Sequence, residues 1–172
     1  MHLSIKHSAA LDAEEIAVNP TQSPADILFL SFTDSDLACM AEVAKNENNI
    51  RLTSIANLKH PLSVDLYIEQ VASHAKIILL RLLGGYDWWK YGVDELHKLA
   101  VAKNIELIMI SGCHADERLA ELSTAPKELV YAVDACFTQG GVENAKRVLH
   151  AIQNYAIPVA NIVDSGSLYK VT

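Results

Sequence analysis

Residues 51–91 read RLTSIANLKHPLSVDLYIEQVASHAKIILLRLLGGYDWWKY, and this stretch decides the fold class of the chain. It begins with an apolar strand predicted at residues 50–56, followed by a proline-initiated helix at residues 63–74. A more apolar strand is predicted at residues 76–83, followed by a double glycine and paired tryptophans. Because a strand buried on both faces is a continuous apolar run, residues 76–83 are predicted to be the central strand.

The same alternation of strand and helix extends to both sides of this stretch. Further strands are predicted at residues 26–32 and 105–111, and further helices at residues 35–45 and 88–103. Asp34 or Ser35 is expected to cap the first helix and Asp87 the last. Strands that alternate with helices form parallel sheets covered on both faces. We therefore predict a Rossmann-like, flavodoxin-like α/β fold with at least four parallel strands.

The last third of the chain changes character, because its pattern is helical without intervening strands. Two helices are predicted at residues 126–137 and 142–154, hinged at Gly140 and Gly141. Four divisions are expected: residues 1–25, a short strand at residues 2–6 with a connecting loop; residues 26–125, the α/β sheet domain; residues 126–155, a helical segment; and residues 156–172, a tail that continues into further sequence.

Composition and charge narrow the classes of function. The net charge of -7 argues against non-specific binding to nucleic acid or to an anionic membrane surface. The longest apolar run contains Arg81 and is far too short to span a bilayer. The three cysteines show no CxxC spacing, which argues against a disulfide framework and against a zinc knuckle. These features favour a cytoplasmic, reduced setting.

Ligands of a parallel α/β sheet bind outside the carboxyl ends of its strands. Four predicted loops lie there, at residues 32–35, 57–60, 84–87 and 112–116. Ordinary turns and helix caps remain the alternative for each loop, because glycine and aspartate are the usual residues of both. The candidate ligand-side residues are Lys59, His60, Gly84, Gly85, Tyr86, Trp88 and His114.

The double glycine and the paired tryptophans are the most conspicuous of these residues. Gly84 and Gly85 would let the backbone approach a ligand, and the following helix would present free N–H groups to an anion. However, the sequence is not G-x-G-x-x-G, and a tight turn remains the alternative. Adjacent helical positions point about 100 degrees apart, so Trp88 and Trp89 cannot both face the core. We expect one to be exposed toward a flat ligand or, more readily, toward another domain.

No residue of this chain is assigned to catalysis or to a metal site. Histidines are scattered without the spacing of metal ligands, and adjacent Cys113 and His114 are a weak signal on their own. No G-x-S-x-G elbow and no Walker A motif occurs in the sequence. We therefore expect no cofactor within this chain.

Beyond these patterns, long segments of the chain resemble a known family. They resemble the N-terminal part of the CobN family, the large subunits of the aerobic-pathway cobaltochelatase, which are akin to the large subunit of magnesium chelatase. The similar segments follow one another in order and cover most of the chain. They are SPADILFLSFTDSDLA at residues 23–38, RLTSIANLKHPLSVDLYIEQV at 51–71, ILLRLLGGYDWWKYGVDEL at 78–96, LAELSTAP at 119–126 and QGGVENAKRVL at 139–149.

The resemblance implies a role within a larger assembly. Members of the family are far longer, and the large subunit binds hydrogenobyrinic acid a,c-diamide and cobalt. An AAA+ ATPase subunit and a partner with a metal-adhesion-type domain drive insertion with ATP. This chain would then be an N-terminal fragment, inactive alone, with a structural or substrate-gating role. Its partners would be the remainder of the large subunit, those two subunits and the tetrapyrrole.

Two alternatives from other classes remain open at the level of sequence. The chain could be a stand-alone small-molecule-binding α/β domain of flavodoxin-like shape. It could also be an interaction module that docks the ATPase subunits through its acidic surface. A reading frame that continues beyond Thr172 would favour the cobaltochelatase fragment over both.

Overall fold

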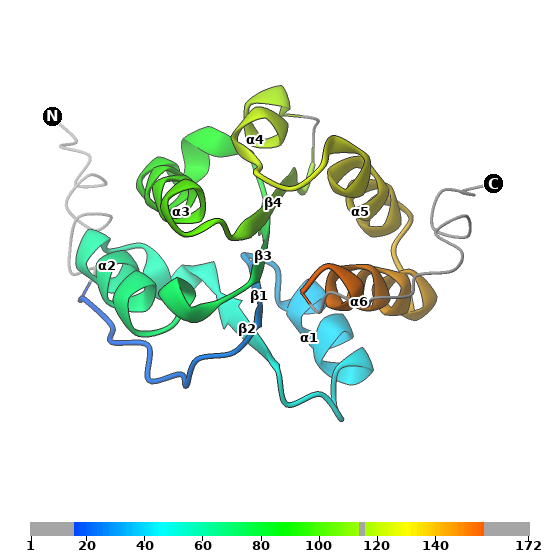
Figure 1. Cartoon of the computed structure of the whole chain (residues 1–172), viewed down its shortest axis with the longest axis horizontal. Coiled ribbons are helices and arrows are strands. Elements are labelled where there is room, and N and C mark those ends of the chain that lie inside the picture. Colours follow the sequence, from blue (N-terminus) through cyan, green and yellow to red (C-terminus); the bar gives the residue numbers. More distant parts are fainter. Residues whose placement is uncertain (1–15, 114–115, 157–172) are drawn as a thin grey trace, which may run out of the picture.

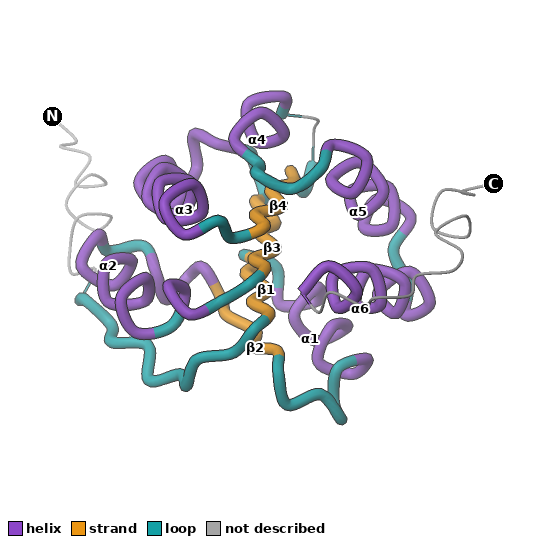
Figure 2. The backbone as a smooth tube through the Cα atoms, in the orientation of Figure 1, coloured by secondary structure: helices purple, strands orange, loops and turns teal. Residues whose placement is uncertain are grey.

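The protein is described by a computed structural model, which covers residues 16–113 and 116–156. Its centre is a four-stranded sheet of order β2-β1-β3-β4, and every neighbouring pair of strands is parallel. Figure 1 shows this sheet between two layers of helices, and Figure 2 traces the same arrangement along the backbone. The strands are β1 (Ile27–Ser31), β2 (Ile50–Ser54), β3 (Ile77–Leu82) and β4 (Glu106–Ser111).

The predicted fold class is therefore confirmed, as is the interior position of β3. All four predicted strands are present, with ends that differ by one or two residues. The largest difference is in β2, which was predicted to extend to residue 56. It ends at Ser54 because Ile55–Leu58 turns into a 3-10 helix, η1, which buries Ile55 and Leu58.

Helices cover both faces of the sheet, as predicted (Figure 1). On one face lie α2 (Pro61–Gln70) and α3 (Lys90–Lys103), and on the other lie α1 (Asp34–Val43), α5 (Lys127–Gln139) and α6 (Val142–Ala156). A short helix, α4 (Glu117–Leu122), lies next to β4. The predicted C-terminal helices are thus α5 and α6. They meet at Gly140 and Gly141, whose φ angles are both positive.

Two hydrophobic cores follow from the alternation of side chains along the strands. In β3, Ile78, Leu80 and Leu82 pack against α2 and α3, whereas Ile77 and Leu79 pack against α1, α5 and α6. All five side chains are fully buried, which explains why the sequence here is apolar apart from Arg81. Arg81 is the one polar side chain of β3, and it belongs to the second of these two faces.

Three of the predicted helix starts need correction. Thr33 rather than Asp34 or Ser35 is the N-cap residue of α1, because Asp34 already has helical geometry. The helix predicted at residues 88–103 begins only at Lys90, since the 3-10 helix η3 (Tyr86–Trp88) precedes it. Asp87 consequently caps nothing and forms ion pairs instead. The helix predicted at 63–74 begins at Pro61, in the first turn where proline needs no N–H partner.

Helix α4 was not predicted, and the segment after it protects the edge of the sheet. The hydroxyls of Thr124 and Ser123 accept hydrogen bonds from the backbone N–H groups of Leu107 and Met109, at 2.8 and 2.9 Å. The Thr124 N–H donates to the Leu107 carbonyl at 2.9 Å. Edge strands are blunted in this way because unpaired backbone groups invite another strand. The strand predicted at residues 2–6 and the tail at 157–172 lie outside the described residues.

Candidate functional site

The carboxyl ends of β1 and β3 form the topological switch point of the sheet. From β1 the chain passes to α1 on one face, and from β3 it passes to α3 on the opposite face. Connections that diverge in this way leave a crevice between two neighbouring strands, where ligands of open α/β sheets bind. Ser31 and Arg81 are the paired residues at that point.

A buried polar cluster fills this switch point. The Ser31 hydroxyl donates to Asp36 Oδ2 at 3.0 Å, and the Thr33 N–H donates to Ser31 Oγ at 3.1 Å. Arg81 donates from Nη1 to the same Asp36 oxygen. The side chains of Arg81 and Asp36 are each only 14% exposed, so this ion pair is shielded from water. The guanidinium also lies 5.0 Å above the centre of the Phe137 ring of α5.

Beside this ion pair lies a cavity of about 400 Å³. Its lining residues come from β3, from the end of β4 and from α5, and they are Arg81, Ser111, Gly112, Cys113, Asp134, Phe137 and Thr138. Two buried polar atoms at this place, Arg81 Nε and Ser111 Oγ, have no hydrogen-bond partner within the described residues. Buried polar atoms in native proteins are normally paired, so these two mark an incomplete polar environment.

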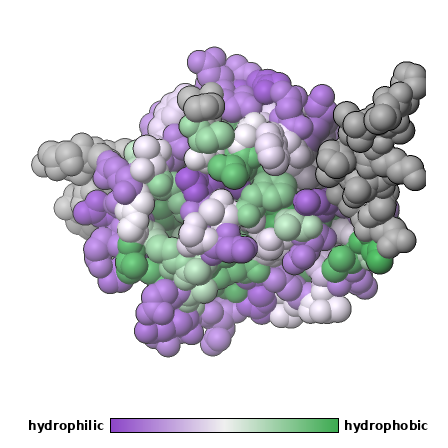
Figure 3. Space-filling model, turned by 180° about the vertical axis from the view of Figure 1, so that it is seen from behind, coloured by the Kyte–Doolittle hydropathy of each residue, from purple (hydrophilic) through white to green (hydrophobic). Residues whose placement is uncertain are grey.

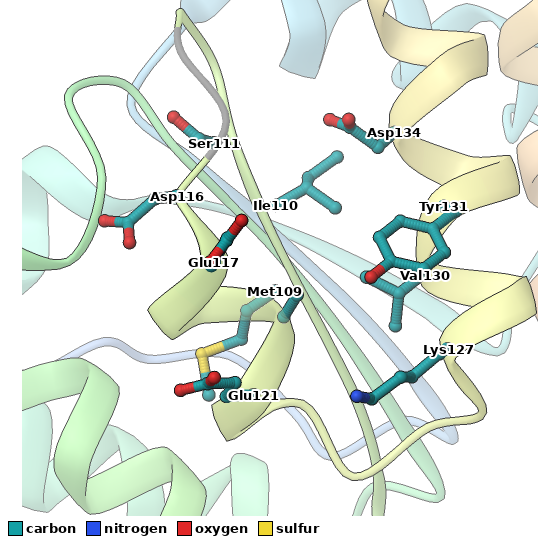
Figure 4. Close-up of a pocket in the computed structure, with 11 residues that line it drawn as sticks. Met109, Ile110, Ser111, Asp116, Glu117, Glu121, Lys127, Val130, Tyr131 and Asp134 are labelled. Carbon is teal, nitrogen blue, oxygen red and sulfur yellow. The ribbon is translucent and has the colours of Figure 1, made fainter.

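Asp134 adds a carboxylate that also lacks a hydrogen-bond donor among the described residues. Burial raises the pKa of Asp134 above its ordinary value, and the nearby Arg81 charge opposes that increase. In Figure 4 the carboxylate points from α5 into the space above β4. A desolvated carboxylate without a donor favours a positively charged or N–H-bearing group beside it.

A second cavity, of about 250 Å³, adjoins the first between α4 and α5 and shares Ser111 and Asp134 with it. Figure 4 shows β4 as its floor, with Met109 and Ile110 between the two helices. Val130 and Tyr131 line the α5 side. Its walls mix these apolar side chains with charged ones, which are Asp116, Glu117, Glu121 and Lys127.

The double glycine lies at the carboxyl end of β3, as predicted, but its neighbours are parts of the protein itself. Gly84 has a φ of +92, and a Cβ placed on it would lie 2.2 Å from the Trp88 ring. Gly85 has a φ of +78, and its Cβ would lie 2.5 Å from an Asp116 oxygen. Glycine is needed at both positions for backbone angle and for space. The geometry therefore supplies a complete structural reason for the motif, while its role toward a ligand stays a prediction.

Tyr86 is held in the same way by the protein's own groups. Its N–H donates to Asp116 Oδ2 at 2.9 Å, and its hydroxyl donates to Asp94 at 2.9 Å. Arg118 lies 5.0 Å above its ring and also donates to Asp87 and Asp116. The Arg118 hydrogen bond and then the Tyr86 N–H lower the pKa of Asp116. This network ties the turn after β3 to the beginning of α4.

The two tryptophans separate into a buried and an exposed residue, which confirms the expectation from their adjacency. Trp89 is 6% exposed and donates from Nε1 to the Leu58 carbonyl at 2.9 Å. Trp88 is 66% exposed, and its ring meets Phe32 edge-on with 6.5 Å between the ring centres. Trp88 and Phe32 form what we call the aromatic ledge, at the carboxyl ends of β1 and β3.

The remaining predicted residues have modest surroundings. His60 is the N-cap of α2, and its Nδ1 accepts the Leu62 N–H at 3.1 Å. Lys59 is exposed beside it. Cys113 is exposed, and its neighbour His114 lies outside the described residues. No group of three or more potential metal ligands occurs in residues 16–113 and 116–156.

With this geometry established, known proteins provide a comparison. No family model matches the chain. The aerobic cobaltochelatase subunit CobN of a Sinorhizobium species is 36% identical over 149 residues, which cover 84% of this chain. CobN of Pseudomonas aeruginosa is 34% identical over the same length. This chain is similar to CobN. The resemblance expected from the sequence segments is thereby confirmed.

The similarity covers most of this chain but little of CobN. The chain spans about 12% of the length of both CobN relatives. Among solved structures, the catalytic subunit of cobaltochelatase from Mycobacterium tuberculosis matches with a TM-score of 0.62. That match covers 80% of this chain and 11% of the other, at 24% identity, and it supports the fold. Within the described residues, no helix is long and apolar enough to cross a bilayer.

The sequence analysis did not identify the residues of the switch-point cluster as site residues. Ser31, Asp36 and Arg81 are spread over 51 positions, and only the sheet register brings them together. One signal was available, because Arg81 interrupts the most apolar strand of the chain. A charge in a strand buried on both faces must have a partner nearby. Asp134 and Ser111 carried no such signal.

Proposed function

We propose that this chain is a piece of the large subunit of an aerobic cobaltochelatase, located in the cytoplasm. In that complex, Co²⁺ is inserted into hydrogenobyrinic acid a,c-diamide during cobalamin biosynthesis, and partner subunits hydrolyse ATP. The observation that carries the proposal is the 36% identity to CobN across 84% of the chain. The agreement of the fold with a cobaltochelatase catalytic subunit supports it.

The contribution of this piece is structural or substrate-gating rather than catalytic. Insertion requires a site that encloses and deforms a macrocycle, removes its two inner protons and exchanges water on the metal. The chain corresponds to about 12% of the length of CobN, which leaves the bulk of such a site to the remaining sequence. Cobalt and the tetrapyrrole are substrates of the whole complex here.

The aromatic ledge is the surface best suited to contact the rest of the large subunit. A large indole that is 66% exposed is a strong contributor to interfaces. Hydrophobic residues also gather near the middle of the face seen in Figure 3, among hydrophilic ones. Because the chain carries a net charge of -7, a partner that contacts its other faces is expected to present a basic surface.

A chimera tests the proposal. In a CobN large subunit, the segment matching residues 16–156 is replaced by this chain, and cobalt insertion is followed by absorbance with the ATPase subunit, its partner and ATP present. We expect the chimera to insert cobalt and a large subunit lacking the segment to fail. A folded but inactive chimera would contradict the proposal. So would ATP-dependent cobalt insertion by the isolated 172-residue chain.

One observation favours a second candidate function, a small-molecule-binding α/β domain. The cavity of about 400 Å³ lies beside the switch point, at the carboxyl ends of β3 and β4, and its volume falls within the size range of small-molecule sites. The two functions are compatible, because a domain of a large subunit can also bind a small ligand.

A further inference from the structure

The exposed tryptophan of the aromatic ledge is held in one place by the surrounding structure. Trp88 ends the 3-10 helix η3, and its N–H donates to the Gly85 carbonyl at 3.2 Å. A Cβ on Gly84 would overlap with Nε1, Cδ1 and Cε2 of Trp88, so the pyrrole ring of the indole packs directly on that glycine. The Phe32 ring meets the indole edge-on. The indole is therefore fixed, although Trp88 is 66% exposed.

The backbone on both sides of Trp88 is anchored as well. Tyr86 donates its N–H to Asp116 Oδ2 at 2.9 Å. Trp89 is buried and donates from Nε1 to the Leu58 carbonyl at 2.9 Å. A side chain that is fixed in advance loses little conformational entropy when a partner covers it. Trp88 thus has the properties of a preorganised binding residue, whereas the domain itself buries only the neighbouring indole.

The exposed indole also retains a hydrogen-bond donor. Trp88 Nε1 has no acceptor within the described residues, in contrast to Nε1 of Trp89. Indole N–H groups usually find an acceptor when the ring is buried, so a surface that covers Trp88 must offer one beside apolar contact area. Neither of the two cavities described above includes Trp88 in its lining. A ring that projects from the surface instead of lining a cavity favours a protein partner over a small ligand.

We propose that Trp88 anchors this domain to the remainder of the large subunit, by entering an apolar recess that offers a carbonyl acceptor to Nε1. The proposal rests on the proposed function, because the chain spans about 12% of the length of CobN and the recess belongs to the other part of that length. Gly84 then contributes to the interface indirectly. Only a residue without a side chain leaves room for the indole at this place.

Hydroxyl-radical footprinting tests the proposal on intact proteins. Peptide mapping by mass spectrometry gives the oxidation rate of Trp88 in the isolated 172-residue chain and in the large-subunit chimera. We expect the rate to fall about tenfold in the chimera, because the exposure of Trp88 should drop from 66% toward the 6% of Trp89. Tyr131 on α5 is 60% exposed and is the internal comparison. An equal fall in rate for Trp88 and Tyr131 overturns the proposal.

The other outcomes separate this proposal from the proposed function. A chimera that inserts cobalt while Trp88 reacts as fast as in the isolated chain overturns the anchor and leaves the proposed function standing. A folded chimera that inserts no cobalt contradicts the proposed function, and the anchor with it. Protection of Trp88 that develops in the isolated chain as its concentration rises assigns the ledge to a second copy of the chain and also overturns the proposal.

Variants of the chimera then measure how much the indole contributes. Trp88→Ala should raise the rate at which a protease releases the domain by about tenfold or more, because the loss of a central interface tryptophan favours the undocked state. Trp88→Phe keeps apolar area without the N–H donor and should give an intermediate rate. Val101→Ala is the matched control, because Val101 is 64% exposed on α3. Equal release rates for Trp88→Ala and Val101→Ala overturn the proposal.

Discussion

Two regions at the carboxyl end of β3 lie on opposite faces of the sheet and differ in how their polar groups are satisfied. The turn at Gly84 and Gly85 is closed on itself, since Tyr86, Asp116 and Arg118 bond to one another. The switch-point cluster around Arg81 instead retains unpartnered groups within the described residues.

This difference shows that the residues most conspicuous in the sequence are not the ones whose polar groups lack partners. Glycines and tryptophans stand out in a sequence. Here, however, the glycine has a steric reason, because the Trp88 ring occupies the volume that a side chain at position 84 would need. Arg81 and Asp134 are inconspicuous by comparison, but they border a cavity. Substitutions in the two regions should distinguish a self-contained turn from an incomplete polar crevice.

Leu80→Asp should unfold the domain. Leu80 precedes Arg81 in β3 but is fully buried in the core on the opposite face, where the described residues offer no cation. The loss combines the removed leucine, about 2–5 kcal/mol, with the burial of an unpaired carboxylate. That sum approaches the whole stability of a typical domain. Circular dichroism during heating measures it, with exposed Val101→Asp as the control. An unchanged melting temperature would show that this core assignment is wrong.

Asp36→Ala should be the next most damaging change. It leaves the buried Arg81 charge unpaired, which costs about 3–5 kcal/mol. Replacing both partners, as Asp36→Leu with Arg81→Met, should recover most of that stability. Asp26→Ala is the matched control, because it breaks the exposed pair with Lys76, which contributes below about 1 kcal/mol. Urea denaturation gives the free energies of unfolding. Equal losses for Asp36→Ala and Asp26→Ala would mean that the cluster is solvated rather than buried.

The same two regions show why sequence predicts the fold better than the site. The apolar run of β3 and the glycines between α5 and α6 are local signals, and both expectations were confirmed, whereas α2 begins at its proline, two residues before the predicted start. Helix α4 was missed because it has six residues and buries only Leu119, too few for a periodic pattern. A short helix of this kind depends on its tertiary contacts.

The candidate site depends on distant pairings that no local pattern encodes. Arg81 and Asp36 lie 45 positions apart, and Tyr86 and Asp116 lie 30 apart. The sequence placed Tyr86 and the glycines at the correct edge of the sheet, because that follows from the order of strands and helices. Only the packing of the side chains shows which of these residues already have hydrogen-bond partners within the protein.

Gly84→Ala should destabilise the turn through two separable effects. A positive φ of +92 strains any side chain, at about 1–3 kcal/mol, and the new methyl group meets the Trp88 ring. Gly140→Ala is the matched control, because Gly140 has a φ of +69 and no heavy atom near its Cβ position. In a Trp88→Ala background, the cost of Gly84→Ala should fall toward that of the control. An equal cost in both backgrounds would show that the indole does not occupy this space.

The smallest effects concern two carboxylates whose pKa values move in opposite directions. The Arg118 hydrogen bond lowers the pKa of Asp116, so this group stabilises the fold above its unfolded pKa of about 3.9, and that contribution is lost as the pH falls through the folded value. Asp116 also caps α4. Asp116→Ala should therefore cost about 1 kcal/mol at neutral pH and less in acid.

Asp134 should behave in the opposite way. Burial raises its pKa, so its ionised form opposes folding at neutral pH, and stability is gained as the pH falls through the folded pKa. Asp134→Asn removes that penalty with little change in helix propensity. It should raise the melting temperature slightly at neutral pH, and the gain should vanish below about pH 4, where both the folded and unfolded carboxyls are protonated. A lower melting temperature for Asp134→Asn at neutral pH would show that the Asp134 carboxylate already has a partner, and the contrast between a closed turn and an open crevice would then be lost.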